Sequence, residues 1–190
     1  MGTLRVGVAL CGSFCTFKQT MDTVGKMVAE GFDVTPIMSF HASTLNTRFG
    51  KAEEFIERLY EMTGKQVIKT IEDAEPIGPK NMLDVLLVAP CTGNTLAKIA
   101  YAVNDTPVTM AVKSHLRNNK PVLLALATND ALGASGKNLG AVLNTKNIYF
   151  VPFRQDAPDS KPKSIVSNFD LVIPAIYKAL DGEQLQPIIL

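Results

Sequence analysis

Nearly unbroken apolar stretches alternate along the chain with segments whose apolar residues recur every three or four positions. The stretches cover 4–10, 83–89 and 121–127, a pattern typical of strands that are covered on both faces of a sheet. The segments between them, among them 17–28 and 96–103, have the spacing of helices that bury one face. This alternation predicts an α/β fold in which helices cover a doubly wound, mostly parallel sheet in three layers. The length of 190 residues predicts a single domain.

The remaining elements are shorter and less regular. We expect strands over 32–39, 66–71 and 148–153, helices over 51–63, 108–116, 136–143 and 164–180, and loops over 39–50, 72–81 and 154–164. The last of these loops is rich in proline, lysine and aspartate, which indicates an exposed segment. Pro36 favours the edge of the sheet for its strand, and Pro90 is expected to end the strand that precedes it.

Composition and charge argue against several classes of protein. A net charge of +1 and the absence of tryptophan provide neither a basic surface nor an aromatic platform for nucleic acid. No apolar run approaches the ~20 residues of a membrane span, so no membrane partner is expected. The spacing of Cys11, Cys15 and Cys91 matches neither a disulfide framework nor a set of metal ligands. We therefore expect the protein to be located in the reducing cytoplasm and to have no metal site. We expect all three cysteines to be buried packing residues.

Small polar residues gather where the predicted strands end, at Cys11–Phe14, Ser39–Ser43, Cys91–Thr95 and Thr128–Asn129. Ligands of doubly wound folds bind at the carboxyl ends of the strands, so these loops are expected to converge. The third loop opens onto a helix N-terminus, which favours a phosphate or another anion. The sequence lacks GxGxxG and GxxxxGK[ST], and an ordinary nicotinamide site or P-loop is therefore not expected in this chain.

These loops resemble the motifs of the flavin-containing cysteine decarboxylase superfamily. Residues 90–95, PCTGNT, are similar to its PASANT motif, and residues 125–129, ALATN, are similar to its APAMN motif. Residues 6–18 are similar to its first strand and the TGSIAAYK loop that follows. The resemblance covers most of residues 4–150. It implies a Rossmann-like flavoprotein that binds FMN and forms a homo-oligomer, either a trimer or a dodecamer of trimers.

The resemblance also implies roles for individual residues. The implied FMN-binding positions are Gly12, Ser13, Phe14, Ser39, Thr92, Gly93, Asn94, Thr95 and Thr128. Asn129 matches the asparagine of APAMN and is a candidate catalytic residue. His41 is a second candidate, because an imidazole can transfer protons near neutral pH. For the hydroxyl residues among these positions, capping of a helix is an alternative role that is compatible with ligand binding.

Two departures from the family motifs bear on the activity. The decarboxylases carry a histidine before the central strand, and the equivalent stretch here, Pro76–Pro79, lacks it. Leu126 and Thr128 replace the proline and the methionine of APAMN. Over its whole length the chain is similar to one component of a two-component oxidoreductase. This similarity implies a partner chain that binds NAD(P). It also implies that the substrate is a small dicarboxylate. The alternatives are a decarboxylase, a flavin prenyltransferase and a non-catalytic partner chain.

A dicarboxylate substrate needs cationic partners, and the guanidinium fork of arginine suits carboxylates best. The cations near predicted loops or helix ends are Arg48, Lys51, Lys113, His115, Arg117 and Arg154.

Overall fold

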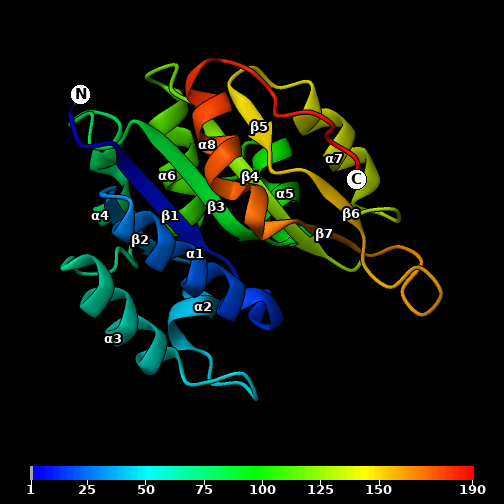
Figure 1. Cartoon of the computed structure of the whole chain (residues 1–190), viewed down its shortest axis with the longest axis horizontal. Helices are drawn as coiled ribbons and strands as arrows, with labels where there is room; N and C mark the ends of the chain where they lie inside the picture. Colours follow the sequence, from blue (N-terminus) through cyan, green and yellow to red (C-terminus); the bar gives the residue numbers. More distant parts are fainter. Residues whose placement is uncertain (1) are drawn as a thin grey trace.

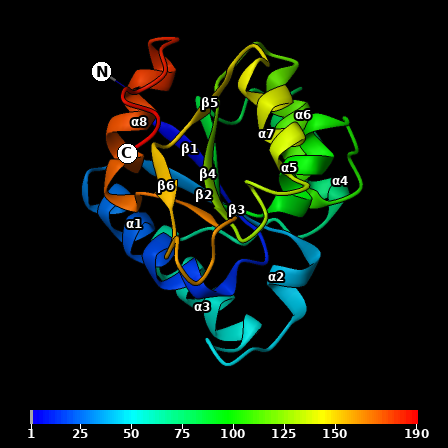
Figure 2. The same cartoon turned by 90° about the vertical axis from the view of Figure 1, so that its right-hand side faces the viewer.

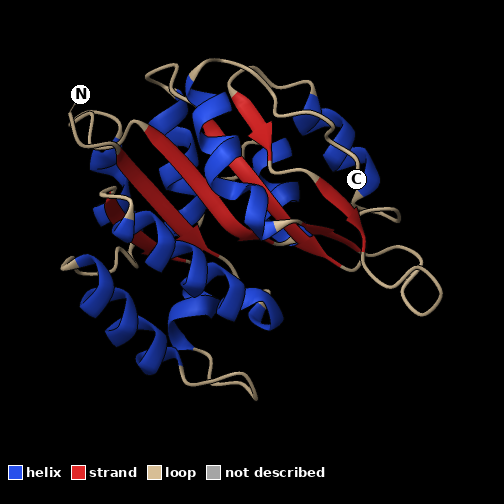
Figure 3. Ribbon diagram, viewed as in Figure 1, coloured by secondary structure: helices blue, strands red, loops and turns tan. Residues whose placement is uncertain are grey.

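A twisted sheet of seven strands runs through the centre of the molecule (Figures 1 and 3). The structure is a computed structural model and describes residues 2–190. The strands are β1 (Arg5–Leu10), β2 (Asp33–Met38), β3 (Val85–Cys91), β4 (Val122–Thr128), β5 (Ile148–Phe150), β6 (Phe153–Gln155) and β7 (Ile165–Ser167). The first five strands are parallel, in the order β2-β1-β3-β4-β5. β7 pairs antiparallel with the last residues of β4, and β6 pairs antiparallel with β7.

Helices cover both faces of this sheet. They are α1 (Phe17–Ala29), α2 (Phe40–Thr44), α3 (Ala52–Thr63), α4 (Ile71–Ala74), α5 (Gly93–Ala100), α6 (Pro107–Leu116), α7 (Gly136–Leu143) and α8 (Val172–Leu180). Figure 2 shows α1 and α8 on one side of the strands and α5, α6 and α7 on the other. The predicted doubly wound α/β fold in three layers is therefore confirmed. No helix within residues 2–190 is both long enough and apolar enough to cross a membrane.

Two apolar clusters, one on each face, explain why the long strands are continuous apolar runs. Successive side chains of a strand point to opposite faces. Val8 and Leu10 of β1 accordingly belong to the cluster that includes Met21 of α1, whereas Ala9 belongs to the cluster that includes Val108 of α6. All five of these residues are at most 1% exposed. A strand with both faces buried in this way requires an apolar residue at nearly every position.

β1 lies between β2 and β3, so the chain leaves β1 in one direction to form β2 and later crosses over to form β3. The loops that follow β1 and β3 therefore diverge at the point where the strand order reverses. In doubly wound folds this is the place where a crevice opens beyond the carboxyl ends of the strands.

Several short elements differ from the sequence-based expectation. The strand expected over 66–71 is wrong, because only Ile68 bridges to β2 and α4 begins at Ile71. Helical turns also interrupt the expected loops over 39–50 and 72–81. Pro90 does not end its strand: β3 continues to Cys91, and a register shift against β4 accommodates the proline. β2 is the outermost strand of its side, as Pro36 predicted.

The helix expected over 164–180 is wrong in its first half. Ile165–Ser167 form β7, and α8 begins only at Val172. Ser167 fixes β7 in place, since its Oγ accepts a hydrogen bond from the Leu126 N–H at 2.8 Å and donates one to the Val151 carbonyl at 3.1 Å. The strand expected over 148–153 is likewise divided into β5 and β6. Residues 153–167 thus form a β6–β7 hairpin with an exposed tip.

Charged side chains join three strands at the opposite, amino-terminal edge of the sheet. The Asp84 carboxylate accepts from the Arg5 guanidinium at 2.6 and 3.2 Å, and Lys120 Nζ lies 3.3 Å from it. These contacts, with Arg5 first, lower the pKa of Asp84 to about 2. His115 is buried nearby, with Nε2 3.1 Å from the Pro121 carbonyl and Nδ1 without a partner among residues 2–190. Burial is the main cause that lowers the pKa of His115 to about 4.

Candidate functional site

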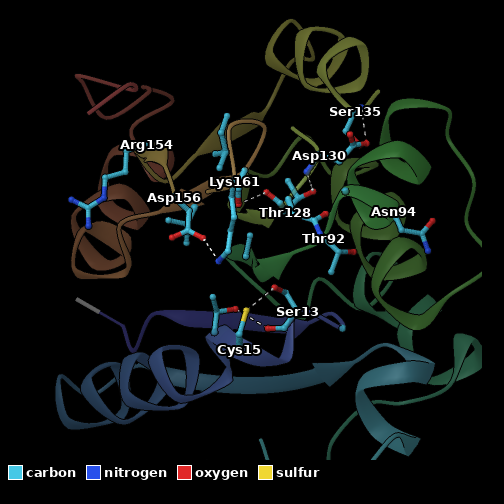
Figure 4. A pocket seen from close by; sticks show the side chains of 18 of the residues that line it. Ser13, Cys15, Thr92, Asn94, Thr128, Asp130, Ser135, Arg154, Asp156 and Lys161 are labelled. Carbon is cyan, nitrogen blue, oxygen red and sulfur yellow. Dashed lines mark hydrogen bonds and ion pairs between the residues drawn. The ribbon is translucent and has the colours of Figure 1, made fainter. Parts of the chain in front are cut away.

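A cavity of about 930 Å³ opens beyond the carboxyl ends of β1, β3 and β4. We call it the large cavity. Figure 4 shows side chains entering it from the loop after β1, from the start of α5, from the loop after β4 and from the hairpin. Among the predicted site residues, its lining includes Gly12, Ser13, Thr92, Gly93, Asn94, Thr128 and Asn129. Three of the four predicted strand-end loops therefore meet here.

A second cavity, of about 350 Å³, lies on the β2 side of the same helix N-terminus. We call it the small cavity. The remaining predicted loop, after β2, contributes Ser39 and His41 to its lining, and Thr95 and Lys98 of α5 line it as well. Gly12, Thr92 and Asn94 line both cavities. The N-terminus of α5 and the turn after β1 thus form a wall that the two cavities share.

The first turn of α5 combines internal capping with unused donors. Thr92 is the N-cap, and its Oγ1 accepts from the Thr95 N–H at 3.2 Å and donates to Thr95 Oγ1 at 3.1 Å. Thr95 Oγ1 in turn donates to the Cys11 sulfur at 3.2 Å. The N–H groups of Gly93 and Asn94 have no carbonyl partner within the helix, because they precede the first helical hydrogen bond. Both N–H groups and the helix dipole favour an anion at this position.

Close packing around this turn favours glycine at position 93. A Cβ at Gly93 would lie 2.8 Å from Thr128 Oγ1 and 3.0 Å from Ser135 Oγ. The α5 N-terminus therefore sits directly against the loop after β4. At Gly12, by contrast, the nearest atoms to a Cβ would be 3.7 Å away or more.

The three cysteines have different environments. Cys11 and Cys91 are buried as expected, and burial raises the pKa of Cys11 to about 11 and that of Cys91 well above its ordinary value. Neither is a thiolate at neutral pH. The expectation for Cys15 is wrong, because Cys15 is exposed and lines the large cavity, with its sulfur 3.8 Å from Ser13 Oγ. It belongs to the short helical turn before α1, and this turn directs it outward.

The structure places the other predicted residues as follows. Phe14 lines neither cavity, and its ring packs against Phe17 at 5.0 Å between centroids. Ser39 caps α2 by accepting from the Ala42 N–H at 3.3 Å, while it also lines the small cavity. The two candidate catalytic residues are in different cavities, with Asn129 in the large one and His41 in the small one. They are not positioned to act together on one reacting atom.

Sequence reasoning missed the contribution of the β6–β7 hairpin. Asp156, Lys161 and Ser164 line the large cavity, whereas only Arg154 of this exposed segment is predicted from the sequence as a candidate site residue. The signal that was available is the β-branched pair Ile165 and Val166, which favours a strand over the helix expected there.

Of the cations considered for a carboxylate, only Arg154 lines either cavity. The α6 cluster that contains His115 lies at the other edge of the sheet, beside Pro121 at the start of β4. Within residues 2–190 no group of three or more histidine, cysteine, aspartate or glutamate side chains could hold a metal ion.

Comparisons with known proteins agree with this geometry. A family model described as Flavoprotein matches residues 1–156. The B subunit of dipicolinate synthase from Bacillus subtilis (strain 168) is 46% identical over 185 residues, which cover 97% of this chain and 92% of that protein. The solved structure of the corresponding B subunit from Bacillus halodurans C has a TM-score of 0.91 and 40% identity, and the match covers 100% of this chain and 98% of that one.

A more distant solved structure shows the same fold. It is that of SpaF, an FMN-dependent cysteine decarboxylase, with a TM-score of 0.66 and 21% identity over 94% of this chain and 95% of that one. At this identity the likeness concerns the fold alone. The family model and the two dipicolinate synthase relatives carry the assignment. This chain therefore belongs to the Flavoprotein family and is related, within it, to the B subunits of dipicolinate synthases.

Proposed function

We propose that this chain is the FMN-binding B subunit of a dipicolinate synthase. In this role it acts with the A subunit of the enzyme, which carries NAD(P), to oxidise dihydrodipicolinate to dipicolinate (pyridine-2,6-dicarboxylate). The proposed location is the cytoplasm of the mother cell in a sporulating bacterium, and the proposed assembly is a homo-oligomer, a trimer or a dodecamer. FMN, when bound, supplies a two-electron acceptor for the hydride that leaves the substrate ring. The relation to the B. subtilis and B. halodurans proteins supports this assignment.

The observation that carries the flavin proposal is the wall that the large and small cavities share. A flavin mononucleotide has an anionic phosphate, a hydroxylated chain and a flat ring, and so needs different chemistry at its two ends. The free N–H groups at the start of α5 and the Ser13 hydroxyl suit the phosphate. The hydroxyl protons of Thr92 and Thr95 are already donated, so these side chains suit the hydroxyl groups of the ribityl chain, from which they can only accept.

The two candidate catalytic residues take separate roles in this proposal. Asn129 lies in the large cavity beside the hairpin, where its amide can orient a substrate by hydrogen bonds. His41 lies in the small cavity with Ser39 and Thr95, on the side proposed for the cofactor chain. Asn129→Ala is expected to lower turnover without weakening FMN binding, and His41→Ala is expected to weaken FMN binding.

The test of the flavin proposal is a titration of the purified full-length chain with FMN, followed by visible absorbance and by quenching of flavin fluorescence. We expect saturable binding that Ser13→Ala and Thr95→Ala weaken. Lys146→Ala, a change at an exposed lysine that lines neither cavity, is the control. A wild-type chain that leaves the spectrum and fluorescence of FMN unchanged would exclude the flavin role.

Activity measurements distinguish the synthase proposal from three alternative functions. A flavin-dependent decarboxylase or a flavin prenyltransferase shares the fold, although Pro76–Pro79 lacks the histidine of the decarboxylases. Release of CO2 from a cysteinyl substrate would favour the decarboxylase, and transfer of a prenyl group to FMN would favour the prenyltransferase. A non-catalytic role is the third alternative, and full dipicolinate synthesis by the A chain alone would support it. The synthase proposal would be supported if dipicolinate synthesis required both chains and if Asn129→Ala abolished that activity.

A further inference from the structure

The tip of the β6–β7 hairpin presents an ion pair to the large cavity. Lys161 Nζ lies 3.0 Å from Asp156 Oδ2, and both residues line the cavity. In Figure 4 the Lys161 amine points between Asp156 and the loop that bears Ser13 and Cys15, whereas Arg154 points outward. Lys161 is therefore the cation that the hairpin directs into the cavity, and Arg154 lies at its rim.

The base of the hairpin holds this pair at a defined position. Phe153, Ile165 and Ser167 are buried, and the Ser164 hydroxyl donates to the Thr128 carbonyl at 3.3 Å. Within the tip, the Asp156 N–H donates to the Ser164 carbonyl at 3.1 Å. The ion pair is thus tied to the last residue of β4, directly before the candidate catalytic Asn129.

The other charged groups of the large cavity do not compete for Lys161. The Asp130 carboxylate accepts from the Ala134 N–H at 3.2 Å and from the N–H and hydroxyl of Ser135, both at 3.3 Å. Arg154 makes no ion pair within residues 2–190. Asp156 is therefore the one carboxylate among the described lining residues that is paired with Lys161.

This ion pair is easily exchanged. The side chains of Lys161 and Asp156 are 57% and 42% exposed, and pairs between such exposed groups contribute little to stability because water screens them. A carboxylate on a rigid ring restricts no rotatable side chain when it pairs with Lys161, and this offsets part of the translational and rotational freedom that a ligand loses on binding. We propose that Lys161 binds a carboxylate of the substrate and that Asp156 is its internal counterion, which the substrate carboxylate displaces. The identity of the substrate rests on the proposed function, whereas the cation and its counterion rest on the hairpin geometry.

The test is calorimetric titration of the full-length chain, with and without FMN, using pyridine-2,6-dicarboxylate as the probe. Lys161→Met is expected to weaken binding about two- to five-fold, the size of an ion pair made by an exposed lysine. Lys161→Arg should restore most of the affinity. Asp156→Asn should strengthen binding a few-fold, because it removes the competing carboxylate. Lys163→Met is the matched control, since Lys163 belongs to the same hairpin loop but does not line the cavity. Pyridine-2,6-dicarboxamide, which lacks the charge, should bind weakly to every variant.

Equal affinities of Lys161→Met and Lys163→Met would overturn the proposal, and so would a wild-type chain that binds the dicarboxylate no better than the diamide. Weaker binding by Asp156→Asn would overturn the counterion role. The FMN titration of the same variants separates this inference from the flavin role. A wild type that ignores FMN but binds the dicarboxylate through Lys161 would overturn only the flavin proposal. Normal FMN binding without any effect of Lys161 would overturn only this inference.

Discussion

Thr95 at the start of α5 donates its hydroxyl to the sulfur of Cys11 at the end of β1, at 3.2 Å. This contact joins the two chain segments that form the wall between the large and small cavities. Thr92 extends it, because its hydroxyl both caps the helix and donates to Thr95. The position of the α5 N-terminus relative to β1 therefore depends on a short chain of hydrogen bonds.

Thr95→Val is expected to lower the free energy of unfolding by about 1 kcal/mol, since it keeps the shape of the side chain but removes both hydrogen bonds of the hydroxyl. Urea denaturation at neutral pH measures the change. Thr95→Ser keeps the hydroxyl and serves as the control. Equal stabilities of the valine and serine variants would show that the contact with Cys11 contributes nothing.

Gly93→Ala is expected to destabilise the protein by about 1–3 kcal/mol, because a Cβ would lie 2.8 Å from Thr128 Oγ1 and 3.0 Å from Ser135 Oγ. Gly140→Ala on α7 is a matched control: no atom lies within 4 Å of a Cβ there, and alanine favours the helix. The thermal midpoint should fall for the first variant and stay constant or rise for the second. A Gly93→Ala protein as stable as the Gly140→Ala protein would contradict the close packing of α5 against the loop after β4.

Asp84→Asn is expected to lower the free energy of unfolding by about 1–2 kcal/mol at neutral pH. Arg5 and Lys120 stabilise the ionised carboxylate and lower the pKa of Asp84 from 3.8 to about 2, and screening by water reduces the size of this effect. When the pKa of a carboxyl group is lowered on folding, the folded state is stabilised at pH values above the ordinary pKa. This contribution is lost as the pH falls from about 4 through 2. Urea denaturation across this range should show the difference between wild type and variant shrinking. Asp159→Asn, at an exposed position, should change little. A difference that stays constant down to pH 2 would count against this linkage.

Burial lowers the pKa of His115 from 6.5 to about 4 by disfavouring the charged imidazolium, whereas the pKa of Asp84 is lowered because its charged form is favoured. In both cases the stability of the folded state decreases as the pH falls. Between the two pKa values of His115 the unfolded chain binds a proton that the folded chain does not, so stability decreases as the pH falls from 7 toward 4. At pH 5 the expected loss relative to pH 7 is about 2 kcal/mol. His115→Gln retains a donor for the Pro121 carbonyl and should flatten this dependence in urea denaturation.

His41→Gln replaces the second of the two histidines and provides the control, because His41 is exposed. The pH dependence of its unfolding should match that of the wild type. If His115→Gln retained the wild-type slope between pH 7 and 5, the buried imidazole would not be its source.

The doubly wound sheet and the loops at its carboxyl edge could be predicted from local sequence patterns. A parallel strand that is buried on both faces needs consecutive apolar residues, as in β3 and β4. The loop at the carboxyl edge of the sheet is simply the segment that follows such a strand in the sequence. The predictions for short segments failed for the converse reason. Ile165–Ser167 are strand because β4, which is distant in the sequence, lies beside them, and the β-branched pair Ile165 and Val166 is too short a local signal to identify that pairing.

The division of the predicted residues between two cavities became visible only in three dimensions. Asn129 and His41 lie in different cavities, although both follow strands that end at the same edge. The fold also exposes Cys15 and brings Lys161 of the hairpin tip to the large cavity. Which loops meet depends on strand order and on the direction in which each loop leaves the sheet, and these follow from packing over the whole chain rather than from any local run of residues.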